Sequence, residues 1–560
     1  MSLVPTIWSS RAPAAAVWCL CPEGTGRDET SRNQASDGGE DTMPEQSESE
    51  VIIVGAGPVG LALGVDLLRR GTDVRIIDRD PAHHPHSKSL ALWPRALEGF
   101  RRLGLIEPLL ERSLTVGALK YYLGERVIRV GFGSLQGSRY RYPVTLPQSA
   151  TEEVLRQGFE DAGGKVEYGT ELTGFTQDAD GVRAVLSVGG HEAEARSQYL
   201  VGCDGAHSTV RQCLGVTFEG AAYPQRFLVA DGVWETSLAQ NETHYFMSPS
   251  GVLVVTSLPG GKARVFLGLG EEVPADQLAD TAQRFAQARC TVPIRAVGEL
   301  QTGIFRVHRR MADRFRVGRV LIAGDAAHIH SPAGAQGLNT GLEDAGALAW
   351  RLAGIRKGEL TPGTLDEWER ERRHTAASVV ADSDRQTRMW TLGGWRSALR
   401  DVALEAADRT GALDRFVAPR QAQLALAYPG DGSRAGKLRS GMRLPDVPLE
   451  GRADQAWLHD KVALDAPVLL LFAADNRTPE RLESTREGAQ RLLGRGGYGK
   501  AVLLSARIPE SFERERTAEI ADPGGDIHRL FGIRKPTAVV VRPDATIGAV
   551  FELKGSTPSR

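Results

Sequence analysis

A glycine loop between an apolar strand and a helix constrains the fold of this chain more than any other feature. Val51–Val54 is a short β-branched run that leads into Gly55-Ala-Gly-Pro-Val-Gly60, and helical spacing follows over Leu61–Arg70. The next apolar strand is Val74–Ile77, which ends at Asp78-Arg79. This order predicts a βαβ unit, in which two parallel strands are joined through a helix.

The loop also has the spacing that binds the phosphates of a dinucleotide. Gly55 allows the tight turn, Gly57 lets the backbone approach a pyrophosphate, and Gly60 lets helix and strand pack closely. Free N–H groups and the helix dipole favour an anion at the helix N-terminus. Asp78 follows Gly60 by eighteen residues, where it can accept hydrogen bonds from ribose hydroxyls. The loop therefore predicts a nucleotide site, although by itself it does not distinguish NAD from FAD.

A later stretch, from Gly318 to Ala345, favours FAD. It runs as a buried strand (Val320–Ala323), a turn at Gly324-Asp325, a glycine-rich loop and then a helix. This layout suits a carboxylate that holds the polyol of a flavin. It also suits a helix N-terminus that points at the flavin ring.

Two further motifs carry a family resemblance. The apolar strand Leu200–Cys203 ends at Asp204-Gly205, with the basic residue Arg211 shortly after, and Gln148 stands where a helix begins after a strand. With these motifs the chain resembles the single-component (group A) flavoprotein aromatic monooxygenases of the para-hydroxybenzoate hydroxylase fold. The resemblance covers about Glu50 to Arg420.

The resemblance implies an FAD site assembled from all of these motifs. Asp204 and Gly205 would serve both FAD and the passing NADPH, and Asp325 would bind a ribityl hydroxyl. The backbone of residues 337–339 would face the N1–C2 carbonyl region of the flavin, where a helix N-terminus stabilises the negative charge of the reduced ring. The expected cofactor-binding residues are Gly55, Gly57, Pro58, Gly60, Asp78, Arg79, Lys88, Gln148, Asp204, Gly205, Gly324, Asp325, Pro332, Gly337, Leu338 and Asn339.

Three positions near these motifs leave alternatives open. Many relatives carry arginine at the place of Lys88, and lysine keeps the charge but lacks the planar fork, so it is either a cofactor contact or a solvated loop residue. His328 and His330 flank the flavin loop, where a structural role is favoured over that of a base. No catalytic side chain is assigned, because the cofactor carries the chemistry.

Composition and charge limit the partners. The formal net charge of -2 does not indicate a nucleic acid partner. No apolar run approaches the roughly 20 residues that cross a bilayer. His83, His84 and His86 lack carboxylate or cysteine ligands at useful spacing, so no metal is expected. The five cysteines are too sparse for a disulfide framework, which favours a cytoplasmic setting.

The pattern along the chain predicts an α/β protein with several domains. Residues 1–48 are expected to be a disordered extension, because the part from 22 to 50 is rich in Gly, Ser, Asp and Glu. Residues 49–223 and 310–425 would form a Rossmann-like FAD-binding domain with a helical extension. Alternating apolar and polar residues over 224–309, with a hairpin at Pro259-Gly-Gly261, predict an inserted antiparallel-sheet substrate domain that includes parts of 117–145.

The C-terminal part, 436–560, has its own pattern. Val468–Ala473 and Ala501–Leu504 look like parallel strands around a helix at Pro479–Leu493, and a hairpin joins Ala538–Val541 to Ile547–Glu552. It resembles the thioredoxin-like domain of phenol hydroxylase and of aromatic polyketide hydroxylases, and that resemblance places a cis-proline at Pro536. The segment has no cysteine, so disulfide exchange is excluded and a structural or dimer-forming role is favoured. The whole protein is expected to be a monomer or a homodimer.

The resemblance implies hydroxylation of an aromatic, phenolic compound such as a polycyclic antibiotic precursor. NADPH or NADH would reduce FAD, and O2 would add to flavin C4a as a hydroperoxide whose distal oxygen passes to an electron-rich ring carbon. The substrate pocket is expected between the flavin and the inserted sheet, with residues from about Phe227–Leu267 contributing. Two alternatives remain open: epoxidation or Baeyer–Villiger oxidation by the same flavin chemistry, and a non-catalytic flavin-binding scaffold.

Overall fold

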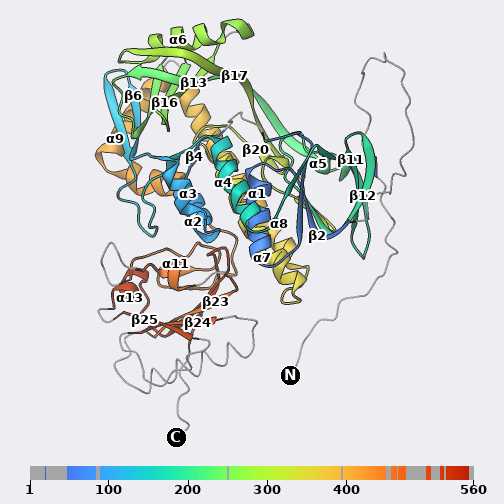
Figure 1. Ribbon diagram of the computed structural model, residues 1–560. Helices are drawn as coiled ribbons and strands as arrows, with labels where there is room; N and C mark the ends of the chain where they lie inside the picture. The colour runs from blue at the N-terminus through green and yellow to red at the C-terminus, as the bar shows by residue number, and fades with distance from the viewer. Residues whose placement is uncertain are drawn as a thin grey trace, which may run out of the picture.

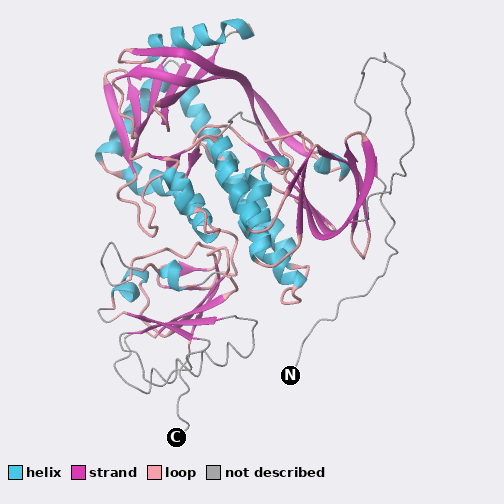
Figure 2. Cartoon of the chain, viewed as in Figure 1, coloured by secondary structure: helices cyan, strands magenta, loops and turns pink. Residues whose placement is uncertain are grey.

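The computed structural model describes residues 19–20, 47–83, 89–248, 251–270, 272–392, 395–449, 456–462, 465–473, 500–505, 517–522 and 525–553 (Figure 1). Lys88, His84, His86 and the helix expected at 479–493 lie outside these residues, as does most of the N-terminal extension. Figure 2 shows the larger sheets in separate parts of the molecule, with long helices between two of them.

The first sheet contains the predicted βαβ unit. Strand β2 (Ser47–Val54) pairs in parallel with β3 (Val74–Asp78) on one side and with β12 (His191–Gly202) on the other, and β12 pairs in parallel with β19 (Val320–Ile322). The helix α1 (Pro58–Arg69) connects β2 to β3. The outer strands are β1 (Cys19–Leu20), β9 (Val166–Tyr168), β10 (Thr170–Gln177), β11 (Val182–Val188) and β18 (Arg316–Val317).

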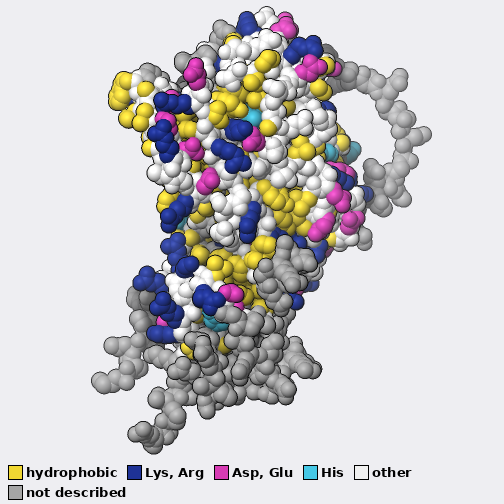
Figure 3. Space-filling model, turned by 90° about the vertical axis from the view of Figure 1, so that its left-hand side faces the viewer, with side chains coloured by type: hydrophobic (Ala, Val, Ile, Leu, Met, Phe, Trp, Pro, Cys, Tyr) yellow, Lys and Arg dark blue, Asp and Glu magenta, His cyan; other side chains and the backbone are white. Residues whose placement is uncertain are grey.

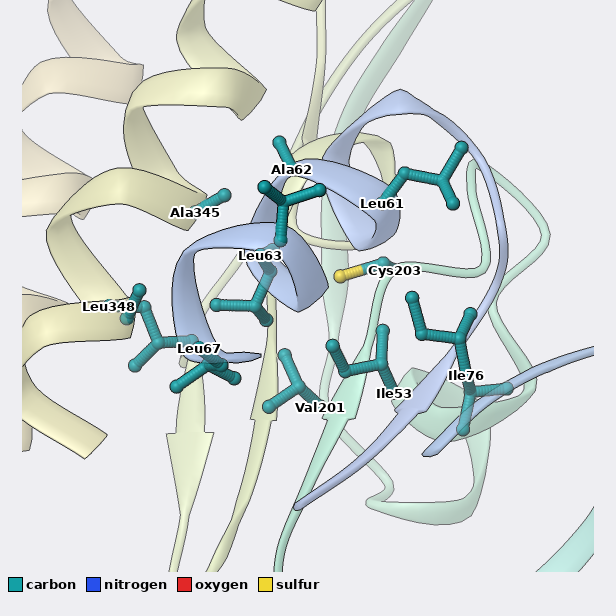
Figure 4. Close-up of a cluster of buried hydrophobic side chains, with 14 of the residues drawn as sticks. Ile53, Leu61, Ala62, Leu63, Leu67, Ile76, Val201, Cys203, Ala345 and Leu348 are labelled. Carbon is teal, nitrogen blue, oxygen red and sulfur yellow. The ribbon is translucent and has the colours of Figure 1, made fainter. Parts of the chain in front are cut away.

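Helix α1 is packed between this sheet and helix α7 (Gly337–Arg356), as Figure 4 shows. Leu63 and Leu67 of α1 are completely buried, as are Ile53 and Val201 of the strands beneath. Burying a side chain of this size stabilises the fold by about 1.5–3 kcal/mol. Because helices cover the strand centre, the strands read as continuous apolar runs rather than alternating ones.

A second, eight-stranded sheet holds the predicted hairpin. Strands β15 (Gly251–Leu258) and β16 (Lys262–Leu269) pair antiparallel across 259–261, as expected. Two long strands, β13 (Phe218–Thr236) and β17 (Ile294–Ala312), run from this sheet toward the first (Figure 1). The remaining strands are β6 (Ala118–Leu123), β7 (Arg126–Gly131), β14 (Glu242–Ser248) and β20 (His328–Ile329).

The two faces of the second sheet pack against different helices. Helix α6 (Leu278–Arg289) packs on one face of the sheet, and the C-terminal end of α8 (Thr364–Thr391) packs on the other. The other described helices are α2 (Pro94–Arg102), α3 (Ile106–Glu111), α4 (Gln148–Asp161), α5 (Thr209–Cys213), α9 (Trp395–Arg409) and α10 (Ala418–Gln421). A small sheet joins β4 (Ala91–Leu92), β8 (Val144–Thr145) and β5 (Leu114–Thr115).

The C-terminal part forms a separate five-stranded sheet, in the order β25-β24-β23-β26-β27. Strand β23 (Val468–Phe472) is parallel to β24 (Lys500–Ser505), and β26 (Thr537–Val541) forms a hairpin with β27 (Ile547–Glu552), both as expected. The short elements here are β21 (Arg434–Ala435), β22 (Leu438–Arg439), α11 (Leu458–Lys461), β25 (Thr517–Ala521) and α13 (Asp526–Phe531).

The expected cis-proline is wrong. All peptide bonds of the described residues are trans, including the one before Pro536. For an X–Pro bond the trans form is lower in energy by about 0.5–1 kcal/mol, so a cis bond needs surroundings that select it.

Buried charged side chains join the C-terminal part to helices α2 and α7. Arg443 donates from Nε to Glu98 Oε2 of α2 over 2.6 Å, and both side chains are almost fully buried. Arg95 donates to Glu343 Oε2 of α7 over 2.8 Å and to the carbonyl oxygen of Asp544 over 2.9 Å. Because an unpaired buried charge is strongly destabilising, these pairs favour one docked arrangement of the two parts.

The Glu98–Arg443 pair predicts a pH-dependent stability. Burial alone would raise the pKa of Glu98, but Arg443 lowers it to about 2. Because this pKa lies below that of the unfolded chain, the pair's stabilisation is present above about pH 4.5 and is lost as the pH falls toward 2. At pH 7 we expect Glu98→Gln to lower the free energy of unfolding by up to about 3–5 kcal/mol. The difference from wild type should shrink below pH 4.5, as measured by urea unfolding.

Glu107 provides the control for this variant. Its carboxylate lies 4.0 Å from Arg101 and is 70% exposed, so Glu107→Gln should change stability by less than about 1 kcal/mol. A Glu98→Gln effect that stays constant from pH 7 to pH 2 would contradict the assigned pair.

The described surface carries both signs of charge. Figure 3 shows basic and acidic side chains interspersed over the face that it displays. Among the described helices, none is both long enough and apolar enough to cross a membrane.

Candidate functional site

Three predicted motifs meet at one edge of the first sheet. Strands β2, β12 and β19 run parallel, so the residues that follow them, Gly55, Asp204 and Gly324, emerge on the same side. A Cβ added to Gly55 would lie 2.5 Å from the carbonyl oxygen of Cys203 and 3.0 Å from the Cα of Asp204. A Cβ added to Gly324 would lie 2.9 Å from a methyl group of Val59 in α1. The fold thus joins segments that are far apart in the sequence.

The glycine loop has the shape that a pyrophosphate requires. Gly55 has a φ of 107°, which favours glycine. A Cβ at Gly57 would meet nothing within 4 Å, so the backbone there is open to a ligand. A Cβ at Gly60 would lie 2.0 Å from the carbonyl oxygen of Gly55, so this position admits only glycine without movement of the backbone. Pro58 is the first residue of α1, where its missing N–H costs no hydrogen bond.

Asp78 braces the glycine loop from the end of β3. Its Oδ2 accepts a hydrogen bond from the backbone N–H of Ala56 over 2.7 Å, and its Oδ1 accepts one from the N–H of Asp80 over 2.9 Å. The side chain stays partly exposed, and Arg79 beside it is exposed. A carboxylate has further lone pairs, so Asp78 can also accept from a ribose hydroxyl.

Asp204 is a partly exposed acid with one carboxylate oxygen that is buried. Its Oδ2 accepts a hydrogen bond from the N–H of Val210 over 3.1 Å, whereas its Oδ1 is buried with no hydrogen-bond partner among the described residues. Burial raises the pKa of this carboxyl group. Because buried polar atoms are normally hydrogen-bonded, this oxygen fits a donor on a bound cofactor. Gly205 follows with a φ of 77° and turns the chain.

Arg211 links the loop at Asp204 to the loop at Asp325. Its guanidinium donates to the carbonyl oxygen of Ala206 and to that of Ala326, each over 2.9 Å, and packs on the ring of Phe218 at 3.9 Å. The sequence showed a basic residue at this place but assigned it no role.

The Gly324–Asp325 turn is held from below by Asp344 of α7. Asp344 Oδ2 accepts hydrogen bonds from the N–H of Gly324 over 3.0 Å and lies 2.8 Å from His328 Nε2, while Oδ1 accepts from Arg372 over 2.6 Å. Although burial opposes ionisation, Arg372 and His328 keep the pKa of Asp344 below its usual value. These contacts favour the structural role of His328. The side chain of Asp325 itself is exposed.

Asp344 was missed at the sequence level. Its position next to Glu343, in a helix rich in apolar residues and glycine, was the available signal. Acids at such positions are seldom buried unless they are paired.

The loop between the turn and α7 is held in an unusual conformation. Ala335 has a φ of 52°, which costs a non-glycine residue about 1–2 kcal/mol. The side chain of Asn339 fixes this loop, because it donates to the carbonyl oxygens of Ala335 over 2.8 Å and of Ala91 over 2.9 Å. Gly337 and Leu338 open α7, and Pro332 lies at the start of the loop. Backbone strain of this kind is frequent at functional sites.

His330 presents a neutral imidazole to the same loop. Its Nδ1 lies 3.0 Å from the carbonyl oxygen of Ser331, and its Nε2 is buried with no hydrogen-bond partner among the described residues. Burial, with a smaller contribution from His328, lowers the pKa of His330 to about 4. At pH 7 the free nitrogen is therefore an acceptor.

Gln148 lies beside Ser89. It is the first residue of α4, its Oε1 accepts from the N–H of Ser89 over 3.0 Å, and its Nε2 donates to Glu152 over 2.9 Å. The structure does not describe Lys88 or the two histidines at 84 and 86. His83 Nδ1 lies 3.4 Å from a carboxylate oxygen of Glu152.

Aromatic side chains of the second sheet pack against the loop before α7. We call this group the aromatic cluster; its members include Trp93, Tyr121, Phe227, Tyr245, Phe266, Phe305, Ala333 and Trp390. Trp93 ties it to the loop, since its Nε1 donates to the carbonyl oxygen of Gly334 over 2.9 Å. Phe227 and Phe266 stack with ring centroids 4.9 Å apart. The cluster therefore places an apolar, aromatic-rich surface next to the loop before α7.

Comparison with known proteins places this geometry in a family. A family model described as an FAD binding domain matches residues 48–383. The chain is 32% identical to 6-methylpretetramide 4-monooxygenase of Streptomyces rimosus, over 92% of this chain and 93% of that protein. It is 29% identical to pentachlorophenol 4-monooxygenase of Sphingobium chlorophenolicum, over 90% of this chain and 94% of that protein.

A solved structure extends the likeness to the whole fold. The anhydrotetracycline hydroxylase of Streptomyces rimosus superposes with a TM-score of 0.71 at 27% identity, covering 91% of this chain and 97% of that one. The matched region contains the three converging loops, and the expected resemblance is confirmed. The chain belongs to the FAD binding domain family, and its relatives include monooxygenases of 6-methylpretetramide and of pentachlorophenol.

Proposed function

We propose that this protein is an FAD-dependent, NAD(P)H-consuming monooxygenase that hydroxylates an aromatic, phenolic substrate with a fused-ring system. The observation that carries the proposal is the convergence of the loops at Gly55, Asp204 and Gly324 beside the aromatic cluster. The relatives are named for a phenol and for pretetramide and tetracycline compounds, which favours a fused-ring phenol here.

The proposed FAD site uses the residues expected from the sequence. The glycine loop, with Asp78, would hold the ADP half, and Asp204 and Asp325 would bind hydroxyl groups of the cofactor. The N-terminus of α7 would face the pyrimidine side of the flavin, because its free N–H groups favour negative charge. The unsatisfied Oδ1 of Asp204 and the open backbone at Gly57 support this fit.

The protein's own contribution would be to exclude water and to position the substrate. FAD, once reduced by NADPH or NADH, would supply the activation of O2 and the oxygen atom that enters the ring. The aromatic cluster would provide a dry surface on which a phenol is held near the loop at 332–337.

We also keep the division of the chain as a proposal. Residues 49–223 and 310–425 would bind FAD, residues 224–309 with parts of 117–145 would bind the substrate, and residues 436–560 would be structural. We also propose, from the sequence pattern and the family resemblance, that the protein is a monomer or homodimer in the cytoplasm.

Asp325→Ala tests the assignment of the ribityl contact. Because the Asp325 side chain is exposed and lies outside the apolar core, we expect the apoprotein to stay folded. FAD content after purification should fall, as measured from the flavin absorbance per protein. Asp313→Ala, which changes another exposed acid before β18, is the control and should retain FAD. Unchanged flavin content in Asp325→Ala would refute the role.

The function itself is tested with the FAD-loaded protein and a panel of phenols. We expect NADPH or NADH oxidation to be slow without substrate and to increase when a suitable phenol is added, with a hydroxylated product formed. A colourless protein that does not take up FAD would contradict the proposal, as would NAD(P)H oxidation that no phenol in the panel stimulates.

A further inference from the structure

Trp390 carries a buried hydrogen-bond donor that has no partner among the residues that the structure describes. The side chain is 6% exposed, and its Nε1–H has no hydrogen-bond partner among the described residues. Leaving such a group unpaired in a buried place is energetically costly. A buried donor without a partner needs a physical reason, and a bound ligand that accepts the hydrogen bond is one.

The position of Trp390 places it beside the proposed flavin loop. Thr387, one turn earlier on α8, donates a hydrogen bond to Ser331 Oγ over 2.6 Å. Trp390 belongs to the same aromatic cluster as Ala333, which is completely buried in that loop. Helix α8 therefore holds the indole at the boundary between the loop at 331–337 and the second sheet.

The neighbours of Trp390 are rings that can stack on a planar molecule. The ring of Tyr245 lies with its centroid 5.6 Å away and that of Phe266 lies 6.4 Å away. Tyr121 stacks on Tyr245 at 4.7 Å. Ring faces give a flat aromatic ligand little hydrogen-bonding direction, so direction here comes from the indole N–H of Trp390 and from the hydroxyl groups of Tyr121 and Tyr245.

We infer that the Nε1–H of Trp390 donates a hydrogen bond to a carbonyl or phenolate oxygen of a planar aromatic substrate, and so selects oxygenated ring systems and fixes their orientation. The inference rests on the proposed function and deepens it by naming a specificity-determining residue. Sites built around a buried donor discriminate strongly against analogues that lack the matching acceptor.

Trp234 provides a matched comparison within the same domain. It is also 6% exposed and its Nε1 also lacks a described partner, but it lies on the opposite face of the sheet, in the cluster that packs against α6. Its donor is therefore remote from the flavin loop. The variant Trp234→Phe therefore controls for the general effects of replacing a buried tryptophan.

The test is a binding measurement on the FAD-loaded full-length protein. The probe is 1,8-dihydroxyanthraquinone, a planar phenol with ring carbonyls, and its Kd is measured by equilibrium dialysis. Variants are Trp390→Phe, Trp234→Phe, and a protein in which 3-benzothienylalanine replaces Trp390, since this analogue keeps the bicyclic shape but has sulfur in place of N–H. FAD content is measured in each as a check on the flavin site.

Loss of one net hydrogen bond should weaken binding by about tenfold in both Trp390 proteins. Trp234→Phe should bind like the wild type. The inference is overturned if the benzothienyl protein binds the probe as tightly as the wild type, since shape alone would then suffice. It is also overturned if the wild type does not bind the probe. Failure of the proposed function is distinct, because it would appear as normal probe binding without NAD(P)H-dependent oxidation.

Discussion

Asp344→Ala is expected to destabilise the protein and to release FAD. The substitution removes the carboxylate that pairs with the buried Arg372 and His328 and that accepts the N–H of Gly324. Breaking a buried ion pair by removing one partner costs about 3–5 kcal/mol, because the remaining charge is left uncompensated. Because Asp344 also anchors the Gly324–Asp325 turn, we expect FAD content to fall with stability. Urea unfolding and flavin absorbance measure the two effects.

Two other variants make the Asp344 result specific. Asp344→Asn keeps the size of the side chain and one acceptor oxygen, so it should lose less stability and less FAD than Asp344→Ala. Asp366→Ala removes an ion pair with Arg316 whose carboxylate is 73% exposed, and it should change stability by less than about 1 kcal/mol. Retention of wild-type stability and FAD content by Asp344→Ala would show that the turn does not depend on this carboxylate.

Gly57→Ala and Gly60→Ala should separate cofactor binding from folding. A Cβ at Gly57 would meet no protein atom within 4 Å, so the apoprotein should be as stable as the wild type. FAD affinity should fall by at least about tenfold, because the methyl group occupies the approach of the pyrophosphate. A Cβ at Gly60 would lie 2.0 Å from the Gly55 carbonyl oxygen, so that variant should lose about 1–3 kcal/mol or more even without FAD.

The glycine pair is measured by urea unfolding of the apoproteins and by FAD titration. Each variant is the control for the other, since both add one methyl group and the two positions are three residues apart. If Gly57→Ala bound FAD as tightly as the wild type, the assignment of the pyrophosphate to this loop would be wrong. A Gly60→Ala apoprotein of wild-type stability would contradict the close packing of helix and strand.

Much of the fold could be predicted because its signals are local. The βαβ unit at 51–78 and the hairpin around 259–261 each lie within a short segment, where strand period and turn residues decide the structure. The meeting of Gly55, Asp204 and Gly324 was also predictable, because parallel strands end at a common edge.

The pairing of buried charges was not predictable in the same way. Glu98 contacts Arg443 across 345 positions of sequence, and Asp344 contacts Arg372 across 28. Nothing local selects one partner among many basic residues, since only the packed fold brings the two side chains together and removes water. The buried donor of Trp390 is of the same kind, because its burial depends on the second sheet closing over α8.

The central claim is most directly tested by isotope transfer from oxygen gas. The FAD-loaded protein is supplied with NADPH, a phenol that stimulates NADPH oxidation, and ¹⁸O₂, and the product is examined by mass spectrometry. The proposed monooxygenase predicts that one ¹⁸O atom appears in a new ring hydroxyl, with none derived from water. A product that carries no label, or NADPH oxidation that yields only hydrogen peroxide with every phenol tested, would contradict it.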